Sequence, residues 1–306
     1  MSTTPPASDD DAGSPQQRRS LIGLFLAFQI IGLIGSIALV LTTTLSRRAS
    51  RSATWQNFFT SWIVSAISYS LLLFTSQAYN DTPPFGVCLA QAGLIYAMPS
   101  FTAATTFGLI TQIWFTMQSL LKRRIASERY WVIALIIIPY CFLVAMATAS
   151  WATGSADPAS VGLIGSGMYC HIDAASGKLG KISGALVALI LLPTVAIEIS
   201  ICVALRQHWK TFRRVRHSFS IMIRVMVFTL IGLLAVSIGA LFVFSSNHGP
   251  AMNIVLAAMP FVSAVIFASQ RDIISVWMFW RPSPSDQTLS ETSTSTTNST
   301  AALVKA

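Results

Sequence analysis

Residues 21–45 have the sequence LIGLFLAFQIIGLIGSIALVLTTTL and contain no Asp, Glu, Lys or Arg. About 20 apolar residues in a helix are enough to cross the hydrocarbon core of a bilayer. Only helices and closed barrels satisfy their backbone groups in lipid, and a barrel strand would alternate apolar and polar residues. This run is continuous, and it is too long for the core of a signal peptide. It therefore predicts a membrane-spanning helix that the protein retains.

Six further apolar runs follow in the chain. Its 306 residues are 53% hydrophobic and only 10% charged, whereas about a quarter of the residues in a soluble domain are charged. This composition excludes an ordinary soluble enzyme. We predict an all-α membrane protein in which residues 21–270 form a bundle of seven transmembrane helices. The expected spans are residues 21–45, 58–78, 87–121, 131–151, 182–205, 219–244 and 251–268.

Basic residues gather in the loops after the first, third, fifth and seventh spans. The chain has 20 Lys and Arg against 11 Asp and Glu, and cytoplasmic loops of membrane proteins are rich in Lys and Arg. The pattern predicts an outer N-terminus and an inner C-terminus in the plasma membrane. The basic charge is then explained by the lipid bilayer, and we expect no nucleic acid as a partner. The inner loops would contact a cytoplasmic protein or, alternatively, anionic lipid. Their candidate residues are Lys122, Arg123, Arg124, Arg213, Arg214 and Arg216.

The two ends of the chain are polar. Residues 1–20 are rich in Ser, Pro and Asp, and residues 282–306 are rich in Ser and Thr, so neither segment can bury a core. We predict a disordered extracellular N-terminus and a disordered cytoplasmic tail. Between the last span and the tail, apolar residues recur at helical spacing over residues 271–281. This pattern predicts an amphipathic eighth helix on the inner leaflet; the alternative is a continuation of the seventh span.

The four cysteines differ in their expected surroundings. Cys141 and Cys202 fall within spans, whereas Cys88 begins the third span at its outer end and Cys170 lies in the long outer loop. Because the outer face is oxidising, we expect a disulfide between Cys88 and Cys170, with two free thiols as the alternative. Asn80 begins an N-x-[ST] acceptor sequence in a short outer loop, which predicts glycosylation on that side.

One carboxylate is expected within the hydrocarbon. Glu198 precedes Arg206, at the inner end of the fifth span, by eight residues, and a charge at this depth is costly unless it has a partner. Arg224, near the inner end of the sixth span, is the candidate partner. We predict an ionic clasp between Glu198 and Arg224; the alternative is a carboxylate that reaches polar side chains or water.

The histidines argue against enzymatic chemistry. His171 and His248 are expected outside, and His208 and His217 inside, so they cannot combine into one membrane zinc site. Residues 251–268 contain no Lys, which excludes a retinal Schiff base in the seventh span. We therefore expect no metal, no cofactor and no enzymatic activity.

Three stretches carry a resemblance to a known family. They are WIVSAISYSLLLFTSQ at 62–77, PPFGVCLAQAGLIYAMPS at 83–100 and FASQRDIISVWMFWR at 267–281. From about residue 21 to residue 281 the chain resembles the seven-transmembrane, G-protein-coupled-receptor-like proteins of mushroom-forming (basidiomycete) fungi. The resemblance implies an outer N-terminus, a bridge from the third span to the second outer loop, and an eighth helix. The inner end of the third span reads QSLLKRR, where rhodopsin-like receptors carry an acidic-Arg-aromatic triplet.

Two functions fit these patterns. The first is a cell-surface receptor that binds a small molecule or peptide from outside, with a heterotrimeric G protein or another signalling protein as its cytoplasmic partner. Its candidate pocket residues are Gln77, Gln91, Tyr96 and Asn253, which could alternatively make hydrogen bonds between helices. The second is a transporter or channel that uses Glu198 as a proton or cation site.

Overall fold

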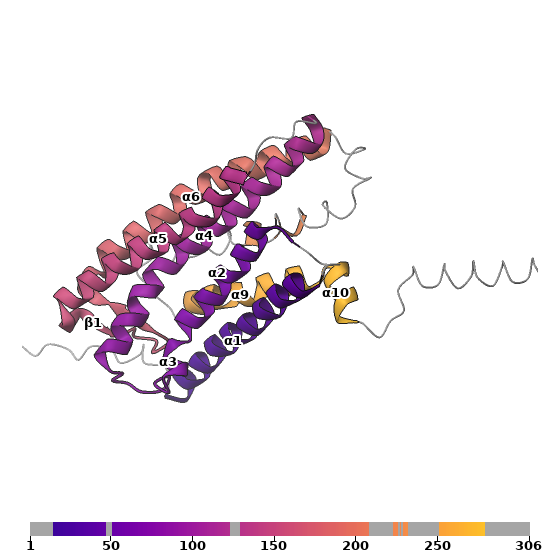
Figure 1. The fold of residues 1–306 in the computed structure, drawn as a ribbon. Helices are drawn as coiled ribbons and strands as arrows, with labels where there is room; N and C mark the ends of the chain where they lie inside the picture. Colours follow the sequence, from indigo (N-terminus) through magenta and orange to yellow (C-terminus); the bar gives the residue numbers. More distant parts are fainter. Residues whose placement is uncertain are drawn as a thin grey trace, which may run out of the picture.

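The computed structural model describes residues 15–46, 51–122, 129–207, 223–225, 227, 229–231 and 251–278. This part of the chain is mostly helical (Figure 1). Its α-helices are α1 (Pro15–Leu45), α2 (Ala53–Tyr69), α3 (Leu71–Phe74), α4 (Phe85–Lys122), α5 (Arg129–Ala156), α6 (Asp173–Gln207), α9 (Ala251–Ala268) and α10 (Arg271–Trp277). A single 3-10 turn (Pro158–Ser160) precedes the strands β1 (Val161–Leu163) and β2 (Cys170–Ile172).

Four of these helices are long and apolar enough to cross a membrane. Their spanning stretches are Gln16–Leu45, Phe85–Ser119, Tyr130–Ala156 and Lys178–Gln207, which overlap the predicted first, third, fourth and fifth spans. The protein is therefore an all-α membrane protein. Most of the predicted sixth span, the Ser/Thr-rich tail and the predicted helix beyond residue 278 lie outside the described residues.

The predicted second span, residues 58–78, is not one continuous helix. The Ser52 hydroxyl accepts a hydrogen bond from the Trp55 backbone N–H and caps the start of α2. The helix begins at Ala53, five residues before the start of the predicted span. The helix ends at Tyr69, the short α3 follows, and Ser76 adopts a left-handed backbone conformation at φ 59°. The break leaves backbone carbonyls at the end of α2 available to other side chains.

The first helix begins earlier than expected. Residues 15–20, which we predicted to be disordered, are helical. Pro15 suits the first turn of a helix because its ring fixes the backbone angle and it lacks an N–H that would have no partner there. Arg18 makes an ion pair with Asp81 at 2.8 Å, which ties this first turn to the connection between α3 and α4.

The long helices run beside one another (Figure 1), with α1 packed against both α2 and α9 and with α4 packed against α2, α5 and α6. The α1–α9 contact is close because of two glycines. A Cβ atom at Gly32 would lie 2.7 Å from both the Pro260 Cβ and the Phe261 backbone N, and one at Gly35 would lie 2.7 Å from the Ala264 Cβ. Only a residue without a side chain fits this spacing.

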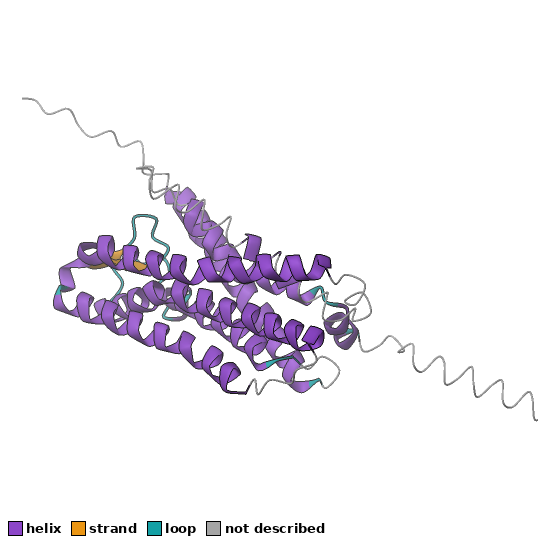
Figure 2. Cartoon of the chain, turned by 90° about the horizontal axis from the view of Figure 1, so that it is seen from above, coloured by secondary structure: helices purple, strands orange, loops and turns teal. Residues whose placement is uncertain are grey.

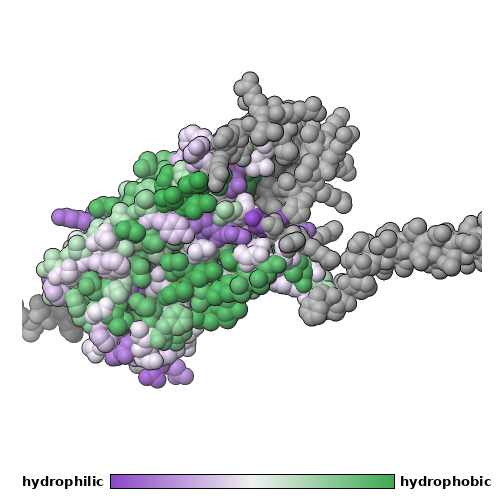
Figure 3. All heavy atoms as spheres, viewed as in Figure 1, coloured by the Kyte–Doolittle hydropathy of each residue, from purple (hydrophilic) through white to green (hydrophobic). Residues whose placement is uncertain are grey.

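The buried core and the exposed surface divide as expected for a chain in lipid. Trp55, Phe58, Phe59 and Phe267 form an aromatic cluster in the core, and each of them is almost completely buried. In contrast, only 17% of the most apolar stretch of α5 is buried. Figure 3 shows extensive hydrophobic surface over the helices. Lipid rather than protein is the natural contact for that surface.

The two strands form a small antiparallel hairpin, which our all-α prediction did not include. Leu163 pairs with Cys170, and the turn between the strands contains Gly167 at φ +73°. Figure 2 shows the strands at one end of the long helices, and α10 lies toward the other. We refer to these as the hairpin end and the α10 end of the bundle.

Candidate functional site

A disulfide anchors the hairpin. The Cys88 and Cys170 sulfurs are 1.99 Å apart and the two Cα atoms 5.2 Å apart, within the normal geometry of a disulfide. The bond joins β2 to the first turn of α4, and both residues are buried. The predicted bridge is confirmed, while Cys141 and Cys202 are free thiols.

Gln91 connects the hairpin to two helices at once. Its side-chain oxygen accepts a hydrogen bond from the Cys170 backbone N–H at 2.9 Å. Its amide nitrogen donates to the carbonyl oxygens of Ser68 and Tyr69, at 3.3 and 3.2 Å. These carbonyls are available because α2 ends at Tyr69. The side chain is fully buried, and its one amide group binds three backbone groups.

Asn253, from α9, binds the turn of the hairpin. Its side-chain oxygen accepts a hydrogen bond from the Tyr169 hydroxyl at 2.9 Å, and its amide nitrogen donates to the Ser166 hydroxyl at 3.5 Å. The Tyr169 ring packs against Phe25 and Tyr69, with centroids 6.2 and 5.8 Å apart. Burial, with the neighbouring tyrosines, raises the pKa of Tyr169 well above its ordinary value, so its hydroxyl stays a donor at neutral pH.

Tyr96 and Gln77 differ in their positions. The Tyr96 hydroxyl is 3.5 Å from the Ile172 carbonyl oxygen on β2, a long hydrogen bond. Gln77 instead accepts a hydrogen bond from the Asn80 amide nitrogen at 2.6 Å, beyond the end of α3. Three of the four predicted pocket residues, Gln91, Tyr96 and Asn253, therefore bind the hairpin, whereas the Gln77 side chain bonds to Asn80. The contacts observed here fit the alternative that these residues hold the structure together.

Asn80 lies in an exposed turn. Its side-chain oxygen accepts a hydrogen bond from the Thr82 backbone N–H at 3.1 Å, and the Thr82 hydroxyl is 3.5 Å from the same oxygen. The asparagine and the hydroxyl of its acceptor sequence thus lie side by side, open to solvent. Glycosylation of Asn80 remains a prediction.

Several further contacts at the hairpin end were not predicted. The Arg18 guanidinium, which pairs with Asp81, also lies over Gly167, where a Cβ would be 2.6 Å from its Nε. Tyr169 and Ser166 were equally unforeseen as partners of Asn253. The one signal in the sequence was Gly167 itself, since a glycine is typical of a tight turn with positive φ. A glycine does not indicate which side chain covers the turn.

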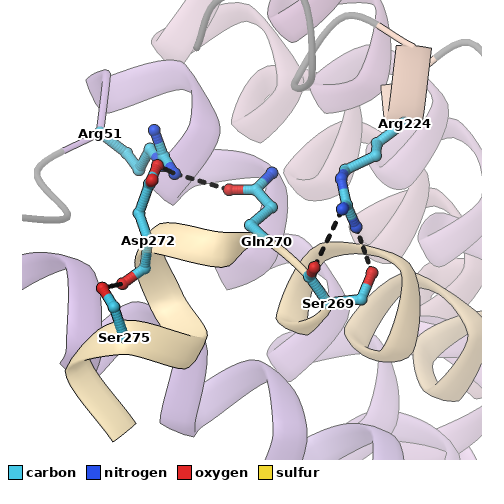
Figure 4. Close-up of polar contacts among 6 residues, drawn as sticks. All are labelled: Arg51, Arg224, Ser269, Gln270, Asp272 and Ser275. Carbon is cyan, nitrogen blue, oxygen red and sulfur yellow. Dashed lines mark hydrogen bonds and ion pairs between the residues drawn. The ribbon is translucent and has the colours of Figure 1, made fainter. Parts of the chain in front are cut away.

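At the α10 end, Arg51 holds the corner between α9 and α10 (Figure 4). Its guanidinium donates to the Gln270 side-chain oxygen at 2.6 Å and to the Asp272 carboxylate at 3.1 Å. Only 4% of the Arg51 side chain is exposed, against 34% for Asp272. Ile273, on the first turn of α10, is fully buried beside Phe267. The corner is therefore fixed by a largely buried ion pair and by apolar packing.

Arg224 reaches the same corner from the described part of the predicted sixth span. Its guanidinium donates to the Ile266 carbonyl oxygen, to the Ser269 hydroxyl and, at 2.9 Å, to the Ser269 carbonyl oxygen. Figure 4 shows it directed at Ser269. The partial negative charge at the C-terminal end of α9 favours a cation at this position.

The predicted clasp between Arg224 and Glu198 is not formed within the described structure, where no ion pair joins them. Glu198 is 8% exposed, its side-chain Oε1 has no hydrogen-bond partner, and Thr229 is its neighbour across the helix interface. The positions of both residues along their predicted spans put the two charges near the same end of the bundle. The Arg224 side chain instead donates to acceptors at the end of α9.

The structure does not describe most residues of the predicted cytoplasmic surface. Residues 123, 124, 213, 214 and 216 lie outside the described residues, and Lys122 is described only as the last residue of α4. Within the described ranges, no three His, Cys, Asp or Glu side chains come together in a way that could hold a metal ion.

The chain matches no model of a known protein family, and a search of curated proteins finds no matching sequence. The geometry of the two ends is therefore the basis for the functional argument.

Proposed function

We propose that the protein is a seven-transmembrane receptor of the plasma membrane, with the hairpin end outside and the α10 end inside. Three observations support this orientation. The disulfide Cys88–Cys170 lies at the hairpin end, and such bonds persist in oxidising surroundings. The exposed acceptor turn at Asn80 lies at the same end. The helices α4 and α6 lead away from the hairpin end, and the described residues Lys122 and Arg206, which directly precede the basic segments of the sequence, lie at their other ends, as expected of a cytoplasmic face.

The observation that carries the proposal is the way the hairpin is attached. It is bonded to α4 through the disulfide, to α2 and α4 through Gln91, and to α9 through Asn253. A ligand that binds the hairpin differently in two conformations would therefore act on three helices together. Such differential affinity is the physical requirement for a receptor switch.

The expected ligand is a small molecule or short peptide with hydrogen-bonding groups. The hairpin end presents the amide of Asn253 and the hydroxyls of Tyr169 and Ser166, which now satisfy one another. A ligand that replaces these contacts would separate α9 from the hairpin. On the inside, the basic loops are the proposed contact for a heterotrimeric G protein or another signalling protein.

Glu198 favours a second candidate, a transporter or channel. A buried carboxyl group with one oxygen that lacks a partner is a group that could take up and release a proton or cation. This function requires an aqueous route through both faces of the protein. A receptor requires only that the two ends be coupled.

One experiment separates the two candidates. Purified protein in liposomes is tested for proton and cation flux, and in parallel for stimulation of nucleotide exchange on a fungal G-protein α-subunit, with a library of small polar molecules and peptides added outside. The receptor proposal expects stimulated exchange that Asn253→Ala reduces, without flux. Flux that Glu198→Gln abolishes, with no exchange under any condition, would overturn the receptor proposal in favour of transport.

A further inference from the structure

A buried side-chain amide in the first half of α1 lacks a partner for its oxygen. Gln29 is 1% exposed, and its side-chain oxygen accepts no hydrogen bond from any described residue. Buried polar atoms nearly always have a hydrogen-bond partner, because leaving one unsatisfied costs free energy. An acceptor of this kind therefore points to a molecule outside the chain that supplies the donor.

The Gln29 side chain is directed toward the hairpin end of the bundle. Long side chains in a helix lean toward its N-terminus and cover the preceding turn, which in α1 holds the buried Phe25. Phe25 belongs to an apolar cluster that includes Met168 from the turn of the hairpin and Ala257 from α9. In the opposite direction, α1 packs closely on α9 at Gly32. A molecule therefore reaches the amide from the hairpin side.

The same cluster already holds one phenol ring. The ring of Tyr169, from the hairpin, packs against Phe25 and Tyr69. Its hydroxyl donates to the Asn253 side-chain oxygen at 2.9 Å. The cluster thus accommodates an aromatic ring that carries a hydrogen-bond donor. Because Tyr169 donates to Asn253, it leaves the Gln29 oxygen without a donor.

We propose that the ligand of the receptor is a small aromatic molecule with a hydroxyl or amine group, which displaces Tyr169 and donates a hydrogen bond to the Gln29 side-chain oxygen. Its ring takes the place of the Tyr169 ring against Phe25 and Tyr69. The proposal rests on the receptor function for the consequence of binding: displacement of Tyr169 breaks its bond to Asn253, and this bond then no longer ties α9 to the hairpin.

The test uses full-length protein in nanodiscs and two probes, p-cresol and 4-methylanisole. Both carry a methyl-substituted ring, and only p-cresol has a hydroxyl donor. Binding is measured by saturation-transfer NMR titration, with empty nanodiscs as the background for partition into lipid. The variants are Gln29→Leu and the matched control Gln207→Leu, which makes the same change at the exposed last residue of α6.

Wild-type protein should bind p-cresol about tenfold more tightly than 4-methylanisole, as expected from one hydrogen bond to a buried acceptor. Gln29→Leu should bind the two probes equally, while Gln207→Leu keeps the preference. Tyr169→Phe retains the ring but loses the bond to Asn253. It should bind p-cresol severalfold more tightly than wild type, because the ring is then displaced at lower cost.

Gln29→Leu should fold, so that its binding can be measured. Without a probe its Tm should equal or exceed that of the wild type, because the change removes an unsatisfied polar group at similar volume. A lower Tm would show that Gln29 has a structural partner and would overturn the proposal.

The binding measurements can overturn it as well. Binding of p-cresol no stronger than to empty nanodiscs, equal affinity of the wild type for both probes, or a preference that persists in Gln29→Leu would each do so. Unchanged p-cresol affinity in Tyr169→Phe would overturn the displacement of that ring.

Nucleotide exchange on the G-protein α-subunit is followed on the same preparations, so that the two proposals fail separately. Binding of p-cresol that depends on Gln29, with no stimulated exchange under any condition, contradicts the receptor function alone. Exchange stimulated by other molecules, with no binding of p-cresol, contradicts the aromatic ligand alone.

Discussion

Replacing Gln91 by Leu should be one of the most destabilising polar-to-apolar changes in the protein. The side chains have similar volume, so packing changes little, but three hydrogen bonds are lost at a fully buried position. The change leaves the Cys170 N–H and the carbonyls of Ser68 and Tyr69 without this partner. An unsatisfied buried group costs about 1–3 kcal/mol.

The two carbonyl bonds are long, at 3.3 and 3.2 Å, whereas the bond from the Cys170 N–H is 2.9 Å. We therefore expect a total loss of roughly 2–5 kcal/mol rather than the full sum of three penalties. For a domain of this size that corresponds to a fall of about 5–15 °C in Tm. Thermal unfolding in nanodiscs, with the disulfide intact, measures it.

Gln77→Leu is the matched control, because it makes the same chemical change at a half-buried glutamine whose partner is the exposed Asn80. It should lower Tm by less than about 3 °C. Gln91→Glu gives a second comparison: it keeps an acceptor for the Cys170 N–H but loses the donor to α2, so its Tm should fall as well. If Gln91→Leu lowers Tm no more than Gln77→Leu does, the hairpin is not held by this amide and the reasoning fails.

Three further predictions follow from particular contacts. Gly32→Val should reduce the yield of folded protein and lower stability by about 1–3 kcal/mol, because its Cβ would collide with Pro260 and the α9 backbone; a wild-type Tm would contradict the close α1–α9 contact. Arg51→Ala should cost about 2–4 kcal/mol and be partly compensated by Asp272→Ala in a double-mutant cycle, and strict additivity of the two changes would rule out the ion pair as the cause. Asn80 should carry an N-glycan, visible as a gel shift that an N-glycosidase removes and Asn80→Gln abolishes; a band that neither treatment moves would show that the turn is not modified.

The long helices could be recognised from sequence because the signal for them is local. An uninterrupted apolar run has no other stable arrangement in lipid, so residues 21–45 define a helix whatever surrounds them. The disulfide could be anticipated for a similar reason, since only two cysteines were expected at the oxidising side. Within the predicted segment 271–281, residues 271–277 are helical and form α10; that this helix lies on the inner leaflet stays a prediction.

Other features depended on where helices end and on which atoms this leaves without partners. The break of the second helix at Tyr69 freed the carbonyls that Gln91 binds, and hydropathy, averaged over many residues, does not register a break of one residue. From the sequence alone, Gln91 could be either a pocket residue or a hydrogen-bonding residue between helices. The hairpin was missed because each strand has only three residues and is fixed by a long-range disulfide.

The sequence by itself determined that the chain forms apolar helices in a membrane, because the cost of exposing backbone groups to lipid acts on every residue of a run. The tertiary structure alone decided the partners of the polar side chains. Arg224 and Glu198 were paired in the prediction by charge and depth, yet Arg224 binds the end of α9. A charged side chain selects among all acceptors within its reach, and the ends of neighbouring helices become acceptors only when the helices have packed.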